Sequence, residues 1–158
     1  MKTTYRAIAG RIRADLAEFA QVTERTLRIW REGRTSGADF YLDAIALNLH
    51  GFYAGLERLL EIIADGVDGT KPTGAQWHQQ LLRQMTSEIA KVRPAVISPG
   101  LRDQLDRYRG FRHVVRNVYT FNLDPEQIEI LIRHLPETVK QLHQELLAFA
   151  DFLENLSE

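Results

Sequence analysis

The spacing of apolar residues along most of this chain is three or four, which is the period of an α-helix and not of a β-strand. No stretch alternates with period two for long enough to predict a sheet. The sequence therefore predicts an all-α fold, an antiparallel bundle of four long helices plus one or two short ones. The clearest series is Leu42, Ile45, Leu49, Phe52, Leu56, Leu59 and Ile63.

Glycine, proline and capping residues predict where the first four helices begin and end. We expect helices over about 3–33 and 38–65, followed by a polar loop from Gly66 to Gly74. Leu47 and Tyr53 fall off the apolar stripe of the second helix, which predicts that it buries a second face. A shorter helix should run from Trp77 to Ile89 and close before Pro94, and the fourth helix should begin at Ser98-Pro99.

The end of the chain contains two prolines that predict two helix starts. Asp124-Pro125 has a capping acid followed by proline at the first helical position, so we expect a short helix to about Arg133. Pro136 then opens the last helix in this interpretation.

Length and composition favour one domain that spans residues 1–158. The chain has 44% hydrophobic and 26% charged residues and no cysteine, so thiol nucleophiles and zinc fingers are excluded. No apolar run approaches the ~20 residues that span a bilayer, and the first residues lack a secretory signal. We expect a cytoplasmic protein with no membrane partner.

The net charge of −1 hides an uneven distribution of charges. Residues 1–34 carry 8 basic and 4 acidic groups, residues 102–123 carry 5 and 2, and residues 124–158 carry 2 and 8. Arginine supplies 16 of the 20 basic residues, which favours bidentate contacts with phosphate or carboxylate. Solvated helix faces with ion pairs would give the same counts.

Common catalytic and metal-binding motifs are absent from the sequence. It contains no phosphate-binding glycine loop, no GxSxG and no HExxH, and its five histidines lack metal-ligand spacing. We expect neither a metal nor a cofactor.

The segment from Arg107 to Leu123 interleaves basic and aromatic side chains. Such a pattern suits single-stranded RNA, because arginine neutralises phosphate and aromatic rings stack on bases. An amphipathic helix with buried aromatic rings and solvated arginines would show the same sequence pattern. Arg112 favours the first interpretation, because it interrupts the core stripe and a buried guanidinium requires a partner or a wet groove. The basic members are Arg107, Arg109, Arg112, His113 and Arg116, and the aromatic ones are Tyr108, Phe111, Tyr119 and Phe121.

The helix order together with FRHVVRNVY resembles the HEPN superfamily, and within it the HepT-like ribonuclease toxins that pair with a minimal nucleotidyltransferase (MNT) antitoxin. The family motif is Arg, four residues of which the first is polar, His, one residue, and Tyr. Arg112, His113 and Tyr119 fill the arginine, polar and tyrosine positions, and Asn117 stands in the histidine position.

The resemblance implies a metal-independent endoribonuclease in which the ribose 2′-OH attacks the adjacent phosphate. It implies catalytic roles for Arg112, His113 and Asn117, and we expect Arg109, Arg116 and Tyr108 to bind the RNA. An amide at 117 cannot exchange a proton at neutral pH. Three alternatives follow: His113 acts as acid and base, electrostatic positioning alone gives slow cleavage, or the protein binds RNA without cutting it.

Helix geometry adds the expectation of a homodimer. On a straight helix, residues 112 and 119 differ by about 20° in direction and residues 112 and 117 by about 140°. Arg112 and Tyr119 would share a face, and Asn117 joins them only if the helix ends or bends, or if two copies of the motif meet. The resemblance implies such a twofold dimer, and also implies that the antitoxin attaches AMP to Tyr119. A tyrosine packed in the core is the alternative for Tyr119.

Two further hypotheses compete with a toxin-type ribonuclease. One is an impaired RNA- or nucleotide-binding module, and the other is a structural protein that binds a partner through its acidic last helix.

Overall fold

The computed structural model describes residues 2–158, and its regular elements are helical. A π-helical turn, Ala64–Asp68, continues α2, and a 3₁₀ turn, Thr120–Asn122, precedes α5. No strand forms within residues 2–158, so the prediction of an all-α fold is confirmed. The helices are α1 (Lys2–Gly33), α2 (Phe40–Ile63), α3 (Trp77–Thr86), α4 (Pro99–Asn117) and α5 (Pro125–Ser157).

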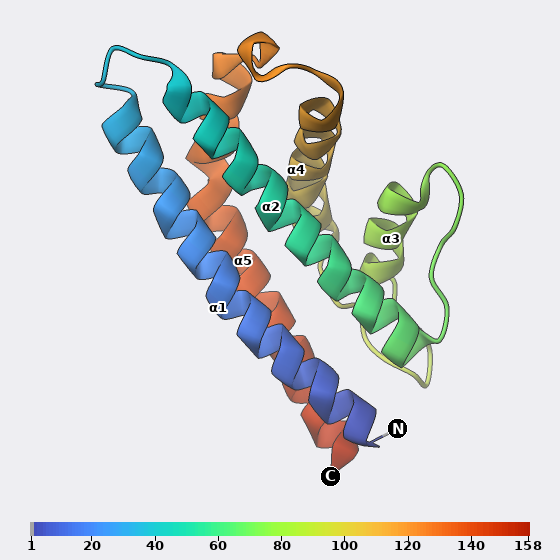
Figure 1. The fold of residues 1–158 in the computed structure, drawn as a ribbon. Coiled ribbons are helices and arrows are strands. Elements are labelled where there is room, and N and C mark those ends of the chain that lie inside the picture. The colour runs from blue at the N-terminus through green and yellow to red at the C-terminus, as the bar shows by residue number, and fades with distance from the viewer. Residues whose placement is uncertain (1) are drawn as a thin grey trace.

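The long helices pack as antiparallel neighbours (Figure 1). α1 lies along α5 over much of its length and also packs on α2, whereas the short α3 lies against α2 and α4. The two ends of the chain lie together, where Lys2 Nζ donates a 3.4 Å hydrogen bond to the carbonyl of Glu158.

α2 is the central helix, because it contacts α1, α3, α4 and α5. Its apolar stripe is buried from Leu42 to Ile63, and Tyr53 is buried on a second face, as predicted. Leu47 instead remains 71% exposed. Glu57, one turn after Tyr53, is 4% exposed and places a carboxylate inside the bundle.

The last helix differs from the prediction, because α5 runs without a break through Pro136. Proline inside a helix removes one backbone hydrogen bond and crowds the preceding turn. Here Ile132, Leu135 and Val139 are buried on both sides of it, and this packing holds the helix together. The predicted division near Arg133 was wrong because tertiary burial outweighs the local preference of proline.

The third helix ends at Thr86, three residues before the predicted end at Ile89. The backbone turns back after it, and Ile89 N donates a 3.0 Å hydrogen bond to the carbonyl of Arg93. This turn brings Arg93 into the interior. The local sequence pattern does not predict that Arg93 is buried.

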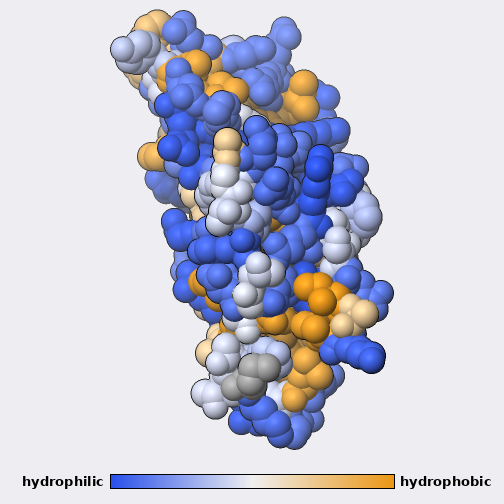
Figure 2. All heavy atoms as spheres, turned by 90° about the vertical axis from the view of Figure 1, so that its right-hand side faces the viewer, coloured by the Kyte–Doolittle hydropathy of each residue, from blue (hydrophilic) through white to orange (hydrophobic). Residues whose placement is uncertain are grey.

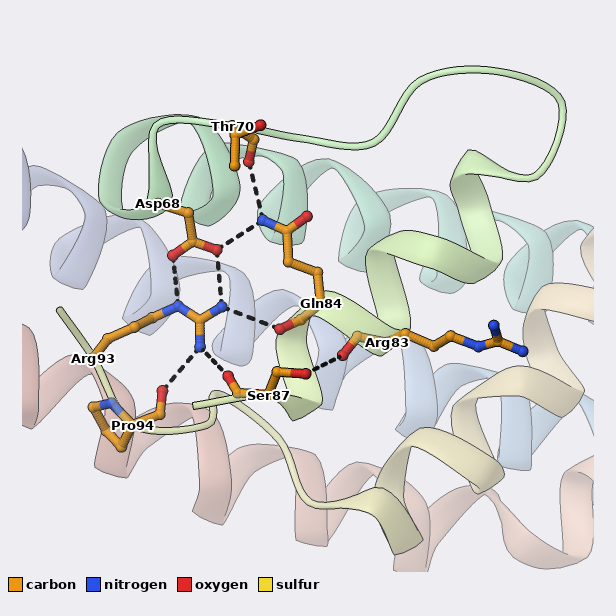
Figure 3. Close-up of polar contacts among 7 residues, drawn as sticks. All are labelled: Asp68, Thr70, Arg83, Gln84, Ser87, Arg93 and Pro94. Carbon is orange, nitrogen blue, oxygen red and sulfur yellow. Dashed lines mark hydrogen bonds and ion pairs between the residues drawn. The ribbon is translucent and has the colours of Figure 1, made fainter. Parts of the chain in front are cut away.

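Arg93 and Asp68 form an ion pair whose side chains are both 0% exposed (Figure 3). Arg93 Nε and Nη2 donate to the two oxygens of Asp68 at 2.5 and 2.8 Å. The remaining guanidinium protons go to the carbonyls of Gln84, Ser87 and Pro94. The cluster therefore ties the end of α3 to the π turn after α2, and this fixes how α3 lies against α2.

No helix of residues 2–158 has the length and apolarity needed to cross a membrane. The face that carries α3 is mainly hydrophilic, with hydrophobic patches near its upper end and a larger one near its lower end (Figure 2).

Candidate functional site

α4 is the helix that carries most of the sequence-predicted site. Its start is fixed by Ser98, whose Oγ accepts from Leu101 N at 3.2 Å and donates to Glu145 of α5 at 3.0 Å. This is an N-cap anchored to a second helix. One face of α4 packs into the core, and the basic side chains of α4 lie outside that face. The buried residues are Leu101, Leu105, Tyr108 and Phe111.

Arg112 lies at the edge of the core, with a side chain 18% exposed. Its Nη1 is 3.7 Å from Glu57 Oε1, which is an ion pair at a distance too long for a hydrogen bond. Its Nε is buried and has no hydrogen-bond partner among residues 2–158. The exposed part of this guanidinium is chemically suited to an anion, because arginine donates to phosphate oxygens in charge-assisted hydrogen bonds.

Glu57 also contacts a histidine from a third helix. His78 Nδ1 lies 2.7 Å from Glu57 Oε2, and the exposed fractions of the two side chains are 27% and 6%. The ring of Trp77 packs on that of His78 with centroids 3.7 Å apart. One buried carboxylate thus links α2 to the arginine of α4 and to the histidine of α3.

His50 lies about two turns before Glu57 on α2, close enough to Arg112 and Arg116 for their charges to act on it. Partial burial lowers the pKa of His50, and the positive charges of Arg112 and Arg116 lower it further. Both effects favour the neutral form of the ring.

The other α4 residues of the predicted site lie at the surface. His113 and Arg116 are exposed, and Arg109 Nε donates to Asp106 at 2.6 Å. Asn117 is the last residue of α4, and its Nδ2 donates a 2.6 Å hydrogen bond to the carbonyl of His113. The amide that replaces the motif histidine therefore satisfies the end of its own helix.

Tyr119 lies outside α4, because the backbone becomes extended at Val118. The straight-helix geometry that would align Arg112 with Tyr119 therefore stops at Asn117, and the structure shows the helix end that was one of the alternatives for Asn117. Tyr119 is 74% exposed and its ring stacks on that of Phe121, with centroids 5.6 Å apart. The hydroxyl lies at the surface and not in the core.

Tyr108 does not lie where RNA could contact it. It is 1% exposed, and its hydroxyl donates a 2.7 Å hydrogen bond to the carbonyl of Leu131 in α5. Burial raises the pKa of Tyr108 to about 12. Its assignment to RNA binding is corrected here: it falls on the apolar stripe of α4 and packs with Phe52.

A polar cleft of about 320 Å³ lies between α3 and α4. Arg83 and Arg102 bring positive charge to it, and Asp103 and Asp106 bring negative charge. Gln79, which follows His78, lines the same cleft. Neither His78 nor Arg112 is among the residues that line this cleft.

Sequence reasoning missed Glu57, His78 and His50. The available signal was on α2, where His50 and Glu57 are seven residues apart and flank the off-stripe Tyr53. That spacing puts them on one face of the helix. Only the fold shows that this face meets α4 and α3.

A family model described as HepT-like protein matches residues 44–153. No curated protein and no solved structure matches the chain. The matched region contains most of α2, all of α3 and α4, and most of α5, and therefore every residue of the candidate site. The resemblance read from the sequence is confirmed at the level of the family: the chain belongs to the HepT-like family of HEPN proteins.

Proposed function

We propose that this protein is a metal-independent endoribonuclease of the toxin type, the activity that its HepT-like family suggests. The observation that carries the proposal is the state of Arg112. Its guanidinium is mostly buried, paired only at 3.7 Å, and retains an unpartnered Nε. Such a group stabilises a phosphate on which negative charge builds up.

The surface around Arg112 supports a nucleic-acid substrate. Arg116 and His113 lie exposed on the same helix, and Arg109 is the next basic residue toward its start. The exposed rings of Tyr119 and Phe121 follow, and unpaired bases stack on such rings. Single-stranded RNA satisfies both features, because its phosphates pair with arginine and its bases are free to stack.

The reaction is an internal transfer within RNA. The ribose 2′-oxygen attacks the adjacent phosphorus, the bond to the 5′-oxygen breaks, and the products end in a 2′,3′-cyclic phosphate and a 5′-hydroxyl. Arg112 stabilises the charge on the phosphate oxygens in the transition state. The reaction needs no metal.

The proposal includes a homodimer and a partner antitoxin. Two copies of α4 that meet across a twofold axis would double the positive charge along one groove. The antitoxin is a minimal nucleotidyltransferase that transfers AMP to Tyr119. The exposure of that side chain supports this step, and the added phosphate would compete with RNA for Arg116 and Arg112.

A cleavage assay on labelled single-stranded RNA tests the proposal. Wild type should release fragments with 2′,3′-cyclic ends in the presence of a chelator. Arg112→Lys keeps the charge beside Glu57 but loses the planar fork, and should cleave at least 10²-fold more slowly. Arg133→Ala, an exposed change on α5, should cleave at the wild-type rate. Equal rates in wild type and Arg112→Lys would overturn the role assigned to the guanidinium of Arg112.

A second function is a non-catalytic RNA-binding module. Asn117 favours it, because this amide stands where the family motif has its histidine. In that case wild type binds RNA with a steep salt dependence but leaves it intact, and Arg112→Ala weakens binding.

A further inference from the structure

Glu57, His78 and Arg112 come from three helices that are distant in sequence, yet they meet around one carboxylate. Oε2 of Glu57 faces Nδ1 of His78 at 2.7 Å, and Oε1 faces Nη1 of Arg112 at 3.7 Å. His78 and Arg112 thus contact different oxygens of the same carboxylate.

The contact with Glu57 determines which nitrogen of His78 carries the proton. A carboxylate only accepts hydrogen bonds, so Nδ1 must donate to it. In the neutral ring Nε2 is then the nitrogen that accepts a proton. A buried carboxylate that orients an imidazole in this way is the arrangement found in general bases of hydrolytic enzymes.

The ring of His78 is also fixed by packing and remains partly exposed. Trp77 packs against one side of it, and the Asp68–Arg93 ion pair fixes the other end of α3. The side chain is still 27% exposed, and Gln79 next to it lines the cleft between α3 and α4. The imidazole is therefore fixed in position and still open to solvent on part of its surface.

The alternatives within the motif are less well placed to move a proton. Asn117 has no titratable group, and its amide donates to the end of its own helix. His113 is exposed, and no carboxylate among residues 2–158 hydrogen-bonds its ring. His78 is the one histidine in the described part of the chain that pairs with a carboxylate.

We propose that His78 is the general base of the RNA cleavage reaction, oriented by Glu57, and that it replaces the histidine that the family motif has at position 117. This inference rests on the proposed endoribonuclease function. His78 Nε2 takes the proton of the ribose 2′-OH as the 2′-oxygen bonds to phosphorus. The bond from phosphorus to the 5′-oxygen breaks, that oxygen takes a proton from water, and the imidazolium returns its proton to solvent. Glu57 is a positioning residue in this scheme.

The first test compares histidine variants in the RNA cleavage assay. His78→Gln should lower the rate of cyclic-phosphate formation at least 10²-fold, because general base catalysis contributes about 10²–10⁴. It should also remove the acidic limb of the pH–rate profile, which a purely structural change would leave in place. His143→Gln, an exposed change on α5, should retain the wild-type rate and profile.

The second test is chemical rescue, which does not depend on an intact contact with Glu57. His78→Gly should cleave slowly and regain at least 10-fold activity when imidazole is added, while Arg112→Ala should not respond. Thermal unfolding of His78→Gln and His78→Gly should show that both variants fold.

The outcomes separate this inference from the proposed function. If wild type shows no Arg112-dependent cleavage, the endoribonuclease proposal fails and the role of His78 fails with it. If cleavage depends on Arg112 but His78→Gln keeps the wild-type rate and pH profile, only the role of His78 is overturned. A loss in His113→Gln with imidazole rescue of His113→Gly would then assign the base to His113.

Discussion

Asp68 and Arg93 form an ion pair with two hydrogen bonds, and both side chains are completely excluded from solvent. The pair joins the π turn after α2 to the segment after α3, and Gln84 completes it by donating to Asp68 at 2.8 Å. Both charges are compensated by direct contacts, so the energetic consequence of the pair appears when one partner is removed.

Asp68→Asn should destabilise the protein strongly. It leaves the guanidinium of Arg93 buried beside a neutral amide, and breaking a buried pair costs about 3–5 kcal/mol. Urea denaturation followed by circular dichroism measures the free energy of unfolding. Glu129→Gln breaks the exposed pair with Arg133 and should change it by about 0.5 kcal/mol or less. A loss below ~1 kcal/mol for Asp68→Asn would mean that the pair is solvated.

Alkaline pH should destabilise the fold through its buried tyrosines. Burial raises the pKa of Tyr108 from 10.0 to about 12, and burial together with the charge of Glu57 raises the pKa of Tyr53. Between pH 10 and 12 the unfolded chain loses these protons and the folded chain keeps them. The stabilisation is therefore complete below pH 10 and is lost as the pH rises toward 12. For Tyr108 alone the loss is about 2–3 kcal/mol.

Tyr108→Phe tests this pH dependence. At pH 7 the variant should lose about 1 kcal/mol, because it lacks the hydrogen bond to Leu131. Between pH 10 and 12 its stability should fall less steeply than that of wild type. Absorbance at alkaline pH should show the ionisation of Tyr53 and Tyr108 only as the protein unfolds. Parallel stability curves for the two proteins would contradict the assignment.

Tyr119→Phe should separate modification from folding. The side chain is 74% exposed, so the free energy of unfolding should change by less than ~0.5 kcal/mol. With a nucleotidyltransferase partner and labelled ATP, wild type should accept AMP and the variant should not. Tyr5→Phe, on α1, is the matched control and should be labelled like wild type. Equal labelling of wild type and Tyr119→Phe would place the modification elsewhere.

Pro136→Ala should stabilise the protein. Alanine restores the backbone hydrogen bond that proline omits from an unbroken helix, a defect that costs about 3 kcal/mol in a helix interior. The gain is reduced by about 1 kcal/mol because the unfolded chain becomes more flexible. We expect a rise of roughly 1–2 kcal/mol in the free energy of unfolding. A fall would indicate that the proline ring is required for the packing of α5 on α1.

Much of the fold was predictable because helical periodicity is a local property. The spacing of apolar residues predicted α1, α2 and the start of α4, and Ser98-Pro99 marked that start correctly. The prediction was wrong at Pro136. There, packing of α5 against helices that are distant in sequence outweighs the local tendency of proline to end a helix.

The candidate site was predictable only in part, because it combines residues from three helices. Arg112 was recognised as an anomaly on the core stripe, but its partner Glu57 lies 55 positions earlier on another helix. Tyr108 and Tyr119 belong to the same interleaved pattern and have opposite surroundings. The sequence pattern alone does not distinguish a core ring from a surface ring at the two ends of such a segment.

The end of α4 at Asn117 bears on the proposed modification of Tyr119. Enzymes that act on protein side chains commonly hold the target segment in an outstretched form. Residues 118 and 119 already have that form, so docking of such an enzyme requires no unwinding of a helical turn. Had α4 continued two residues further, each encounter would first have had to melt its terminus.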